Sequence, residues 1–560
     1  MTADTNANIS RHLDLMAAAR PDSAAVKVPV GNAPDGSIRY LSLSFSELAA
    51  EVAAWRAKLA VEGVRRGDRT LVMVRQGLPL IAAVFALFGL GAVPVVLDPG
   101  MGRKSFLACV ARSQPRVLLG IPLARLMSRL WRKPFASVRV RVAASSNPAA
   151  RLAGKAPPGG GPPTAVCAPD ELAAILFTSG STGAPKGVCY THGMLAAQVE
   201  LVRETYGIRP GEVDLPLLPV FALFNPALGM TTIVPETDPR RVAASDPAKI
   251  VRAILQENVT NSFGSPTLWA LVGDHCKRHN LRLPSLRRVL CAGAAVPPKL
   301  WRDLRDILPG GEIHSPYGAT EILPLTDLSA TEALDGLAVT LGGGGSRVGK
   351  PLPGNKVRVI AITDAPVATL GETRQAAVGE IGEIIATGPA VTREYDRLPD
   401  ATALAKITDA DTGEIWHRMG DCGYLDAGGN LWFCGRKTER VVTPQGVLFT
   451  GQVEPVFNAH PAVRRSALIG LSRRGRPGVI RPAIVIEPRD PRILKNTFAL
   501  ENLINDLRLL ALKRPLTADI NLFYFRGDFP VDVRHNAKIH RNALARWAAG
   551  ARGHKANPLR

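Results

Sequence analysis

Residues 178–187 read Thr-Ser-Gly-Ser-Thr-Gly-Ala-Pro-Lys-Gly and combine hydroxyls, glycines and a lysine in one short segment. They follow an apolar run, residues 172–177, which predicts a buried strand ending in a tight loop. Glycines let the backbone turn closely and direct its N–H groups at one point, and the hydroxyls and lysine add donors and positive charge. This is chemistry suited to a polyphosphate. The candidate binding residues are Thr178, Ser179, Gly180, Ser181, Thr182, Gly183 and Lys186.

A flexible Ser/Gly linker is the alternative interpretation of this segment. Linkers rarely follow a buried strand or end in Pro-Lys-Gly, so we favour the phosphate loop. The segment does not match the Walker A pattern, because Gly187 stands where that pattern requires Ser or Thr after the lysine. We therefore expect ATP to bind on a fold other than that of the P-loop proteins.

The composition is that of a soluble globular enzyme with two to four domains. The chain has 560 residues, 46% hydrophobic and 21% charged. Its seven cysteines are scattered and form no CxxC pair, which disfavours a zinc site or a disulfide framework and favours a reducing compartment. The first residues lack the basic and apolar regions of a secretion signal. We therefore expect a cytoplasmic location.

The formal net charge is +21, which can attract nucleic acid, anionic lipid or acidic proteins. The basic residues are spread out and do not form one long basic block, and no nucleic-acid-binding signature is present. We favour a basic surface that attracts ATP and carboxylates over a specific nucleic-acid partner.

The elements that must position the loop follow from hydrophobic periodicity. Residues 46–66 have helical spacing and residues 69–74 are strand-like, an alternation that recurs and predicts α/β layers. Residues 80–97 are nearly all apolar, but they contain Gly89, Gly91 and Pro94. A helix, a break and a strand explain them better than a transmembrane span does.

Composition changes mark the domain boundaries. Residues 144–166 are rich in Pro, Gly and Ala and predict a loop before the phosphate segment. Four glycines at 342–345, followed by strand-like residues 357–362 and 382–387, predict a smaller β-rich subdomain. Helical patterns and short strands follow after residue 440. Boundaries are therefore expected near 340 and 438.

Four further segments make the first one specific. Residues 317–321 read Tyr-Gly-Ala-Thr-Glu, residues 417–421 His-Arg-Met-Gly-Asp, residues 435–440 Gly-Arg-Lys-Thr-Glu-Arg and residues 536–541 Asn-Ala-Lys-Ile-His-Arg. In this order and spacing, they resemble the motifs of the adenylate-forming superfamily, which includes acyl-CoA synthetases, luciferases and peptide-synthetase adenylation domains. The resemblance covers essentially the whole chain.

The resemblance and the periodicity together predict an α/β fold in two parts. Residues 1–437 would form a large N-terminal part of layered α/β sheets, with the β-rich subdomain from about residue 340. Residues 438–560 would form a small mobile α+β C-terminal domain that carries the catalytic lysine. The cofactors implied are ATP and Mg²⁺.

The resemblance assigns roles to the residues of the 317–321 segment. Tyr317, next to Gly318, would stack on adenine, Thr320 would meet the α-phosphate, and Glu321 would hold Mg²⁺ together with Thr182. A hard cation requires oxygen ligands of this kind. The alternative is that these residues have only structural roles, with Tyr317 as a core aromatic and Glu321 as a helix cap.

The remaining roles fall on the rest of the chain. Ala292, Gly293 and Ala294 would line the adenine pocket, where small residues let a flat base approach the backbone. Asp421 would accept both ribose hydroxyls, with Arg436 also reaching the ribose. Lys538 would bridge the substrate carboxylate and the α-phosphate. Alternatively, Asp421 is a turn residue and Lys538 an ordinary surface lysine.

Departures from the family pattern concern the second half of the reaction. Ala222 stands where thiol-using members have a gating His, Thr438 replaces the usual hinge Asp or Lys, and residues 536–537 replace Ser-Gly before the lysine. Such changes disfavour coenzyme A as acceptor. Residues 224–232, 316–321, 432–437 and 529–539 together look like the β-lactone synthetases of bacterial long-chain olefin biosynthesis.

That branch implies a 2-alkyl-3-hydroxy fatty acid substrate and association with other enzymes of the olefin pathway. After adenylation the substrate's own hydroxyl would displace AMP, because tethering supplies its effective concentration. A fatty acyl-CoA or acyl-AMP ligase, a non-catalytic scaffold and a nucleic-acid binder remain as alternatives. Residues 221–230 and 263–267 would line the acyl pocket, or else simply pack in the core.

Overall fold

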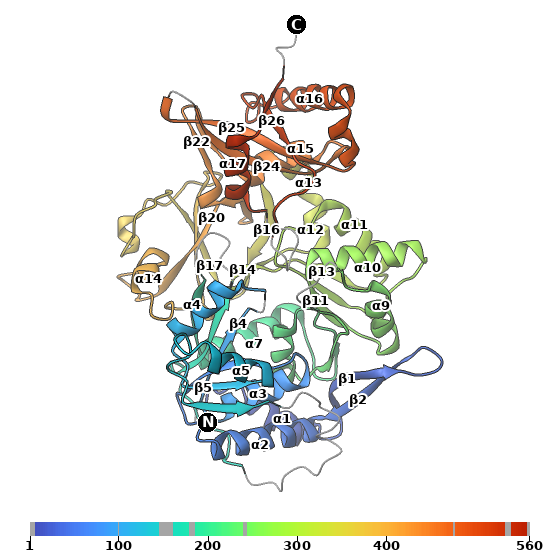
Figure 1. Ribbon diagram of the computed structural model, residues 1–560, viewed down its shortest axis with the longest axis vertical. Helices are drawn as coiled ribbons and strands as arrows, with labels where there is room; N and C mark the ends of the chain where they lie inside the picture. Colours follow the sequence, from blue (N-terminus) through green and yellow to red (C-terminus); the bar gives the residue numbers. More distant parts are fainter. Residues whose placement is uncertain are drawn as a thin grey trace.

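The computed structural model describes residues 6–98, 100–144, 161–178, 185–238, 244–473, 476–531 and 539–556. Figure 1 shows the N-terminal layers at one end of the molecule and the C-terminal strands and helices, in orange and red, at the other.

A six-stranded sheet carries the predicted phosphate loop. Its strands are parallel except for the last pair, in the order β6-β5-β3-β4-β7-β8. Short apolar runs suit a sheet that helices cover on both faces. The elements are β3 (Arg69–Met73), α3 (Leu78–Gly89), β4 (Val93–Leu97), α4 (Arg103–Ser113), β5 (Val117–Gly120), α5 (Pro122–Leu130), β6 (Val140–Ala143), β7 (Leu172–Thr178) and β8 (Lys186–Thr191).

This sheet confirms the helix-break-strand interpretation of residues 80–97. The helix α3 ends at Gly89 and β4 begins at Val93. Gly91, between them, has φ +66°, a left-handed conformation that favours glycine. Among the described residues, no helix combines the length and apolar character needed to cross a bilayer.

A seven-stranded sheet and its helices pack around one of the buried core clusters. Its order is β13-β12-β11-β9-β10-β1-β2, and only the hairpin β1–β2 is antiparallel. The strands are β1 (Ala24–Asn32), β2 (Ile38–Ser44), β9 (Val213–Asp214), β10 (Thr231–Ile233), β11 (Asn261–Gly264), β12 (Arg288–Cys291) and β13 (Glu312–His314).

Helices and short turns connect these strands. The predicted helix at 46–66 is confirmed as α2, whose N-terminus has a capping box in which Ser44 and Glu47 satisfy each other's backbone N–H groups. The connecting elements are α1 (Arg11–Ala19), α2 (Phe45–Val61), α7 (His192–Tyr206), η1 (Pro219–Leu223), α8 (Asn225–Leu228), α9 (Pro247–Gln256), α10 (Pro266–Arg278) and α11 (Pro298–Ile307).

An antiparallel sheet follows and takes in strands from before residue 340. Its main order is β14-β15-β16-β21-β20-β18-β17, and β19 pairs with β20. The predicted strands at 357–362 and 382–387 are confirmed as β17 and β18. The elements are β14 (Tyr317–Ala319), β15 (Ile322–Asp327), α12 (Ala330–Asp335), α13 (Leu337–Leu341), β16 (Ser346–Pro351), β17 (Lys356–Ile360), η3 (Leu370–Glu372), β18 (Gly382–Thr387), α14 (Pro399–Ala405), β19 (Lys406–Thr408), β20 (Ile415–Leu425) and β21 (Leu431–Arg436).

The C-terminal part is built on a four-stranded sheet, β24-β25-β26-β27. The expectation of only short strands here was wrong, because β24 and β25 form one long antiparallel hairpin with apolar residues of both strands in the core. The elements are η4 (Lys437–Glu439), β22 (Val441–Thr443), β23 (Gly446–Leu448), α15 (Thr450–Asn458), β24 (Val463–Arg473), β25 (Arg476–Pro488), η5 (Pro491–Lys495), α16 (Thr497–Leu512), β26 (Leu522–Phe525), α17 (Arg541–Gly550) and β27 (His554–Lys555).

Candidate active site

The predicted phosphate loop is closed by the antiparallel pair β7 and β8. Thr178 pairs with Lys186 at the end of the ladder, so the two described ends of the segment lie on neighbouring strands. Ser179, Gly180, Ser181, Thr182 and Gly183 lie outside the described residues. The Lys186 side chain is exposed, and its Nζ lies 4.6 Å from the centre of the Tyr395 ring, a cation–π contact.

The turn between β14 and β15 presents the next two predicted residues. Ala319 pairs with Ile322, which leaves Thr320 and Glu321 as the two turn residues. The Tyr190 hydroxyl donates to the Thr320 carbonyl oxygen. A hydrogen bond of 2.6 Å joins the Tyr395 hydroxyl to Glu321 Oε1. Two tyrosines from different elements therefore fix the backbone and the carboxylate of this turn.

A buried polar cluster lies behind Glu321. His417 Nε2 lies 4.0 Å from Glu321 Oε2. The Lys406 ammonium donates to both the carbonyl and the hydroxyl oxygen of Thr392, and the Thr392 N–H donates to the Glu321 carbonyl at 2.8 Å. Glu321 is thus held through its main chain as well as its side chain.

Burial sets the charge of this cluster. It lowers the pKa of Lys406 to about 7; the Glu321 carboxylate opposes this shift and Lys186 adds to it. Burial also lowers the pKa of His417 well below its usual value, and the neighbouring Lys406 acts in the same direction. His417 is therefore a neutral imidazole at physiological pH, and Lys406 exchanges its proton near neutrality.

A second cluster joins three residues that the sequence assigned to the nucleoside. The Tyr317 hydroxyl donates to Asp421 Oδ2 at 2.6 Å, and an Arg436 guanidinium nitrogen lies 2.9 Å from Asp421 Oδ1. Asp421 and Arg436 are cross-strand partners in β20 and β21. Burial, followed by the Asp421 charge, raises the pKa of Tyr317 far above its usual value. The phenol stays protonated and remains a hydrogen-bond donor.

Glycines keep the backbone open at both predicted adenine-pocket segments. A Cβ on Gly318 would lie 2.6 Å from the Ile322 carbonyl oxygen, so no other residue fits this hairpin undistorted. Ala292, Gly293 and Ala294 follow β12 at the carboxyl end of the parallel strands, and Gly293 has φ +96°. This edge is where open α/β sheets bind ligands.

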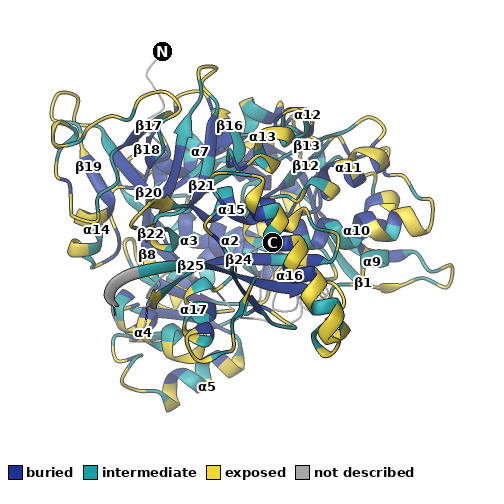
Figure 2. Ribbon diagram, turned by 90° about the horizontal axis from the view of Figure 1, so that it is seen from above, coloured by how far each residue is buried: buried dark blue, intermediate teal, exposed yellow. Residues whose placement is uncertain are grey.

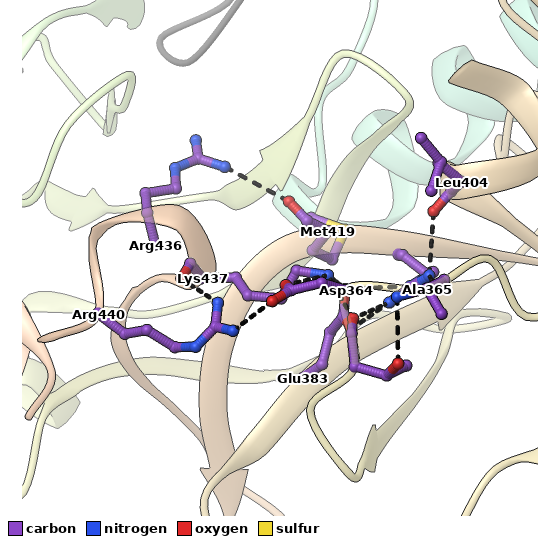
Figure 3. A network of polar contacts seen from close by, with 10 residues as sticks. Asp364, Ala365, Glu383, Leu404, Met419, Arg436, Lys437 and Arg440 are labelled. Carbon is purple, nitrogen blue, oxygen red and sulfur yellow. Dashed lines mark hydrogen bonds and ion pairs between the residues drawn. The ribbon is translucent and has the colours of Figure 1, made fainter. Parts of the chain in front are cut away.

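The segment after β21 contacts both parts of the chain. Arg440 forms a 2.6 Å ion pair with Asp364, and the Lys437 ammonium lies 3.0 Å from Glu383 (Figure 3). Between them, Glu439 pairs with Arg541 at 2.8 Å. Neighbouring residues of one short segment are therefore attached alternately to the antiparallel sheet and to the C-terminal domain.

Lys538 lies outside the described residues, but both ends of its segment are held. Val531 pairs with Ile539, and the His540 N–H donates to the Pro530 carbonyl at 2.9 Å. Arg541 then binds both oxygens of the Glu454 carboxylate at 2.7 Å. The described residues on both sides of the segment are therefore joined to each other, and Arg541, whose side chain is 17% exposed, attaches them to Glu454.

The segments expected to line an acyl pocket carry stacked aromatic rings. The Phe221 and Phe263 rings stack with centres 3.6 Å apart, and the Phe224 ring lies 6.3 Å from that of Phe221. Asn225, the residue after Phe224, donates a hydrogen bond to Asp214 at 2.8 Å. Burial raises the pKa of Asp214 to about 7, opposed by the Asn225 hydrogen bond. The stacked aromatic residues are thus followed directly in the chain by Asn225, which belongs to a buried polar pair.

The structure adds contacts of four residues to which the sequence analysis gave no role, although His417 and Arg541 stand within two of the motif segments. Tyr395, Lys406 and His417 surround Glu321, and Arg541 anchors the Lys538 segment. The signal available in the sequence was weak: Lys406 and His417 are polar residues within strand-like segments, where a buried charge is unexpected.

Comparison with known proteins agrees with these features. Residues 14–396 match the family described as AMP-binding enzyme. The chain is 43% identical over 558 residues to an olefin beta-lactone synthetase of Xanthomonas campestris pv. campestris, covering 98% of each chain. It is 42% identical to an olefin beta-lactone synthetase of Stenotrophomonas maltophilia, covering 97% of this chain and 98% of the relative.

Solved structures show the same fold at low sequence identity. The O-succinylbenzoate coenzyme A synthetase of Bacillus subtilis in complex with ATP and magnesium ion matches with a TM-score of 0.73 and 22% identity, covering 95% of this chain and 98% of that one. The amide bond synthetase McbA of Marinactinospora thermotolerans matches with a TM-score of 0.75 and 21% identity, covering 96% and 99%. The predicted α/β class, with a large N-terminal and a small C-terminal part, is confirmed.

Proposed function

We propose, on the premise that this chain belongs to the AMP-binding enzyme family, that it is an ATP-dependent β-lactone synthetase of olefin biosynthesis. The observation that carries the proposal is the full-length identity of 43% to an enzyme of that name. The substrate would be a 2-alkyl-3-hydroxy long-chain fatty acid. The enzyme would convert ATP and the hydroxy acid to the lactone, AMP and pyrophosphate.

In the first step the substrate carboxylate attacks the α-phosphorus of ATP, and the bond to pyrophosphate breaks. Lys186 and Lys538 offset the negative charge that would otherwise repel the nucleophile. Thr320 orients the α-phosphate, and Tyr317, Asp421 and Arg436 hold the nucleoside. The product is a mixed anhydride of the acid with AMP.

In the second step the substrate's 3-hydroxyl oxygen attacks its own acyl carbon. A four-membered ring closes, the bond to AMP breaks, and the hydroxyl proton is released. The ring is strained, and cleavage of the reactive anhydride makes its formation favourable. Because nucleophile and electrophile belong to one molecule, no second substrate has to enter.

The residues around Glu321 suit a magnesium ion. Mg²⁺ is typically held by one or two carboxylates together with water and substrate phosphates, rather than by a protein cage. The described residues contain no group of three or more metal-ligating side chains, and Glu321 presents a single part-exposed carboxylate. Glu321 and Thr182 would hold the ion, which would neutralise phosphate charge.

The cellular setting is part of the same proposal. ATP is a cytoplasmic substrate, and all seven cysteines are buried and free, as expected where thiols stay reduced. The activity would be cytoplasmic, with the other enzymes of the olefin pathway as associated partners.

The test is an incubation of the purified full chain with ATP, Mg²⁺ and a synthetic 2-alkyl-3-hydroxy acid. A product with lactone carbonyl absorption, formed together with AMP in the absence of coenzyme A, is expected. The matched control is the same 2-alkyl acid without its 3-hydroxyl, which should be adenylated but release no AMP. A strict requirement for coenzyme A would instead support the alternative, a fatty acyl-CoA ligase.

A further inference from the structure

Basic residues are spread along the chain, but one long segment contains no acidic residue to offset them. Between residues 99 and 169 there are twelve lysines and arginines and not a single Asp or Glu. This segment alone accounts for more than half of the net charge of +21. The basic residues are Arg103, Lys104, Arg112, Arg116, Arg125, Arg129, Arg132, Lys133, Arg139, Arg141, Arg151 and Lys155.

In the middle of this segment, α5 exposes an apolar face. Only Ala124 and Ser128, two small residues one turn apart, are buried. Leu123, Leu126 and Leu130 are 60%, 52% and 69% exposed. Their spacing of three and four residues places them on one face of the helix, directed away from the body. Figure 2 shows α5 at the edge of the molecule.

Uncompensated cations flank the exposed leucines. Arg129, Arg132 and Lys133 are exposed, and within the described part of the chain none of them pairs with a carboxylate. Arg129 is also close enough to Arg141 to lower its pKa, although burial of Arg141 is the larger cause. The surface therefore offers positive charge and apolar contact together, and the residues that the structure describes supply no counterpart for either.

We propose that α5 and the cations at its C-terminal end dock this protein on the surface of an anionic phospholipid bilayer. Leucines of a basic amphipathic helix leave water by entering the headgroup–acyl boundary, while Arg and Lys remain at the lipid phosphates. A nucleic acid would satisfy the cations but leave the leucines against a hydrated backbone. This surface lies outside the proposed catalytic cluster, and the inference stands without the lactone chemistry.

For the long-chain acid of the proposed function, the bilayer is also where the substrate partitions. An enzyme held at the surface draws its substrate from the membrane, where that substrate is concentrated, instead of from water. This consequence rests on the proposed function; the docking itself does not.

The test is co-sedimentation of the full chain with vesicles of phosphatidylcholine alone or mixed with phosphatidylglycerol. Binding to the anionic vesicles, weakened by added salt, is expected. Neutralising three charges near the surface should lower the partition coefficient by about tenfold or more. Removing the apolar face should do the same. The two test variants are Arg129→Gln/Arg132→Gln/Lys133→Gln and Leu123→Ser/Leu126→Ser/Leu130→Ser.

Matched controls change the same residue types elsewhere. They should bind vesicles as the parent does, and all variants should keep the parental melting temperature and pyrophosphate release. Parental binding by both α5 variants, equal binding to neutral vesicles, or retention on duplex DNA without vesicle binding would each overturn the proposal. The controls are Arg278→Gln/Arg302→Gln/Arg305→Gln on α10 and α11, and Phe498→Ser/Leu509→Ser/Leu512→Ser on α16.

Discussion

Glu321 is a carboxylate whose position depends on residues from other segments of the chain. Tyr395 holds one carboxylate oxygen, and Lys406, through Thr392, holds the backbone. Groups that orient a metal ligand in this way commonly affect metal affinity as strongly as some ligands do. Tyr395 and Lys406 are therefore positioning residues for the proposed magnesium ion.

Replacing Tyr395 by Phe tests this role. The variant loses the 2.6 Å hydrogen bond to Glu321 and keeps the ring beneath Lys186. Magnesium affinity should fall by about tenfold to 100-fold, as for other residues that support a ligand. The measurement is the Mg²⁺ concentration that gives half-maximal pyrophosphate release at saturating ATP.

The matched control is Tyr424→Phe, which removes a 2.9 Å hydrogen bond to the Gly344 carbonyl. Its magnesium dependence should match that of the parent. If both variants shift the magnesium requirement equally, the effect is general destabilisation and Tyr395 does not position Glu321.

For individual residues, the sequence pointed to candidates within the motifs but not to the residues that hold them in place. Tyr317, Asp421 and Arg436, spread over three segments, are brought together by a hydrogen bond and an ion pair to Asp421. Lys406 and His417 were not assigned roles, because their significance arises from burial beside Glu321, which appears only when strands from distant segments pair. The roles of all these residues in catalysis remain predictions.

The short helix α8 shows how an element is held by one polar pair. Asn225, its first residue, donates to Asp214 of β9 and to Thr232 of β10. The helix and the aromatic residues before it are therefore attached to strands β9 and β10 of the seven-stranded sheet. The raised pKa of Asp214 makes this attachment sensitive to pH.

The variant Asp214→Asn should become more stable relative to the parent as pH rises. The native state retains a proton on Asp214 up to about pH 7, whereas the unfolded chain releases it near the ordinary value of 3.8. Parent stability thus falls between these two pH values and levels off above them. Asparagine carries no titrating group and should not show this loss.

The measurement is the difference in melting temperature between variant and parent at pH 4, 6 and 8, taken as approximate set points across that window. The exposed Asp22→Asn provides the control and should show no such trend. A difference for Asp214→Asn that does not change with pH would contradict the assigned pKa shift.

Elements were predictable where a periodic pattern stood between clear breaks. The helix α2 and the strands β3, β17 and β18 follow from local pattern, cap and turn residues. The β24–β25 hairpin was expected as shorter strands, because its length depends on the partner strand that each residue meets. The inclusion of β14 and β15 in the antiparallel sheet likewise depends on pairing across distant segments.

Residues 437–440 contact both the antiparallel sheet and the C-terminal part, and Arg541 is one of their partners on the C-terminal side. Its guanidinium binds the carboxylates of both Glu439 and Glu454. Glu454 is buried and the Glu439 side chain is 11% exposed, so removing the arginine that the two acids share is costly.

The variant Arg541→Met should destabilise the C-terminal domain by about 3–5 kcal/mol, because it leaves the buried Glu454 and the part-buried Glu439 without their cation. Denaturant unfolding, followed by a probe in that domain, measures the loss. The control Arg546→Met changes an exposed arginine of the same helix and should cost little. Equal stabilities for the two variants would show that the Arg541 pairs contribute no net free energy.

The proposed catalytic lysine is tested by Lys538→Ala, with the exposed Lys513→Ala as its control. Loss of a charge that stabilises the transition state typically costs about 100-fold to 1,000-fold in rate, and adenylation should fall by this amount. ATP–pyrophosphate exchange with the hydroxy acid measures it. A Lys538→Ala variant that exchanges as fast as the parent would remove Lys538 from the mechanism.

The hydrogen bond between Tyr317 and Asp421 has a consequence for the release of AMP. If Asp421 accepts the ribose hydroxyls as proposed, an arriving ribose would replace the phenol as donor, and the net gain in binding free energy would be small. After AMP leaves, the phenol would donate to Asp421 again, beside the Arg436 ion pair. A donor of this kind would lower the affinity for AMP and favour its release, which suits an enzyme that must release AMP after every turnover.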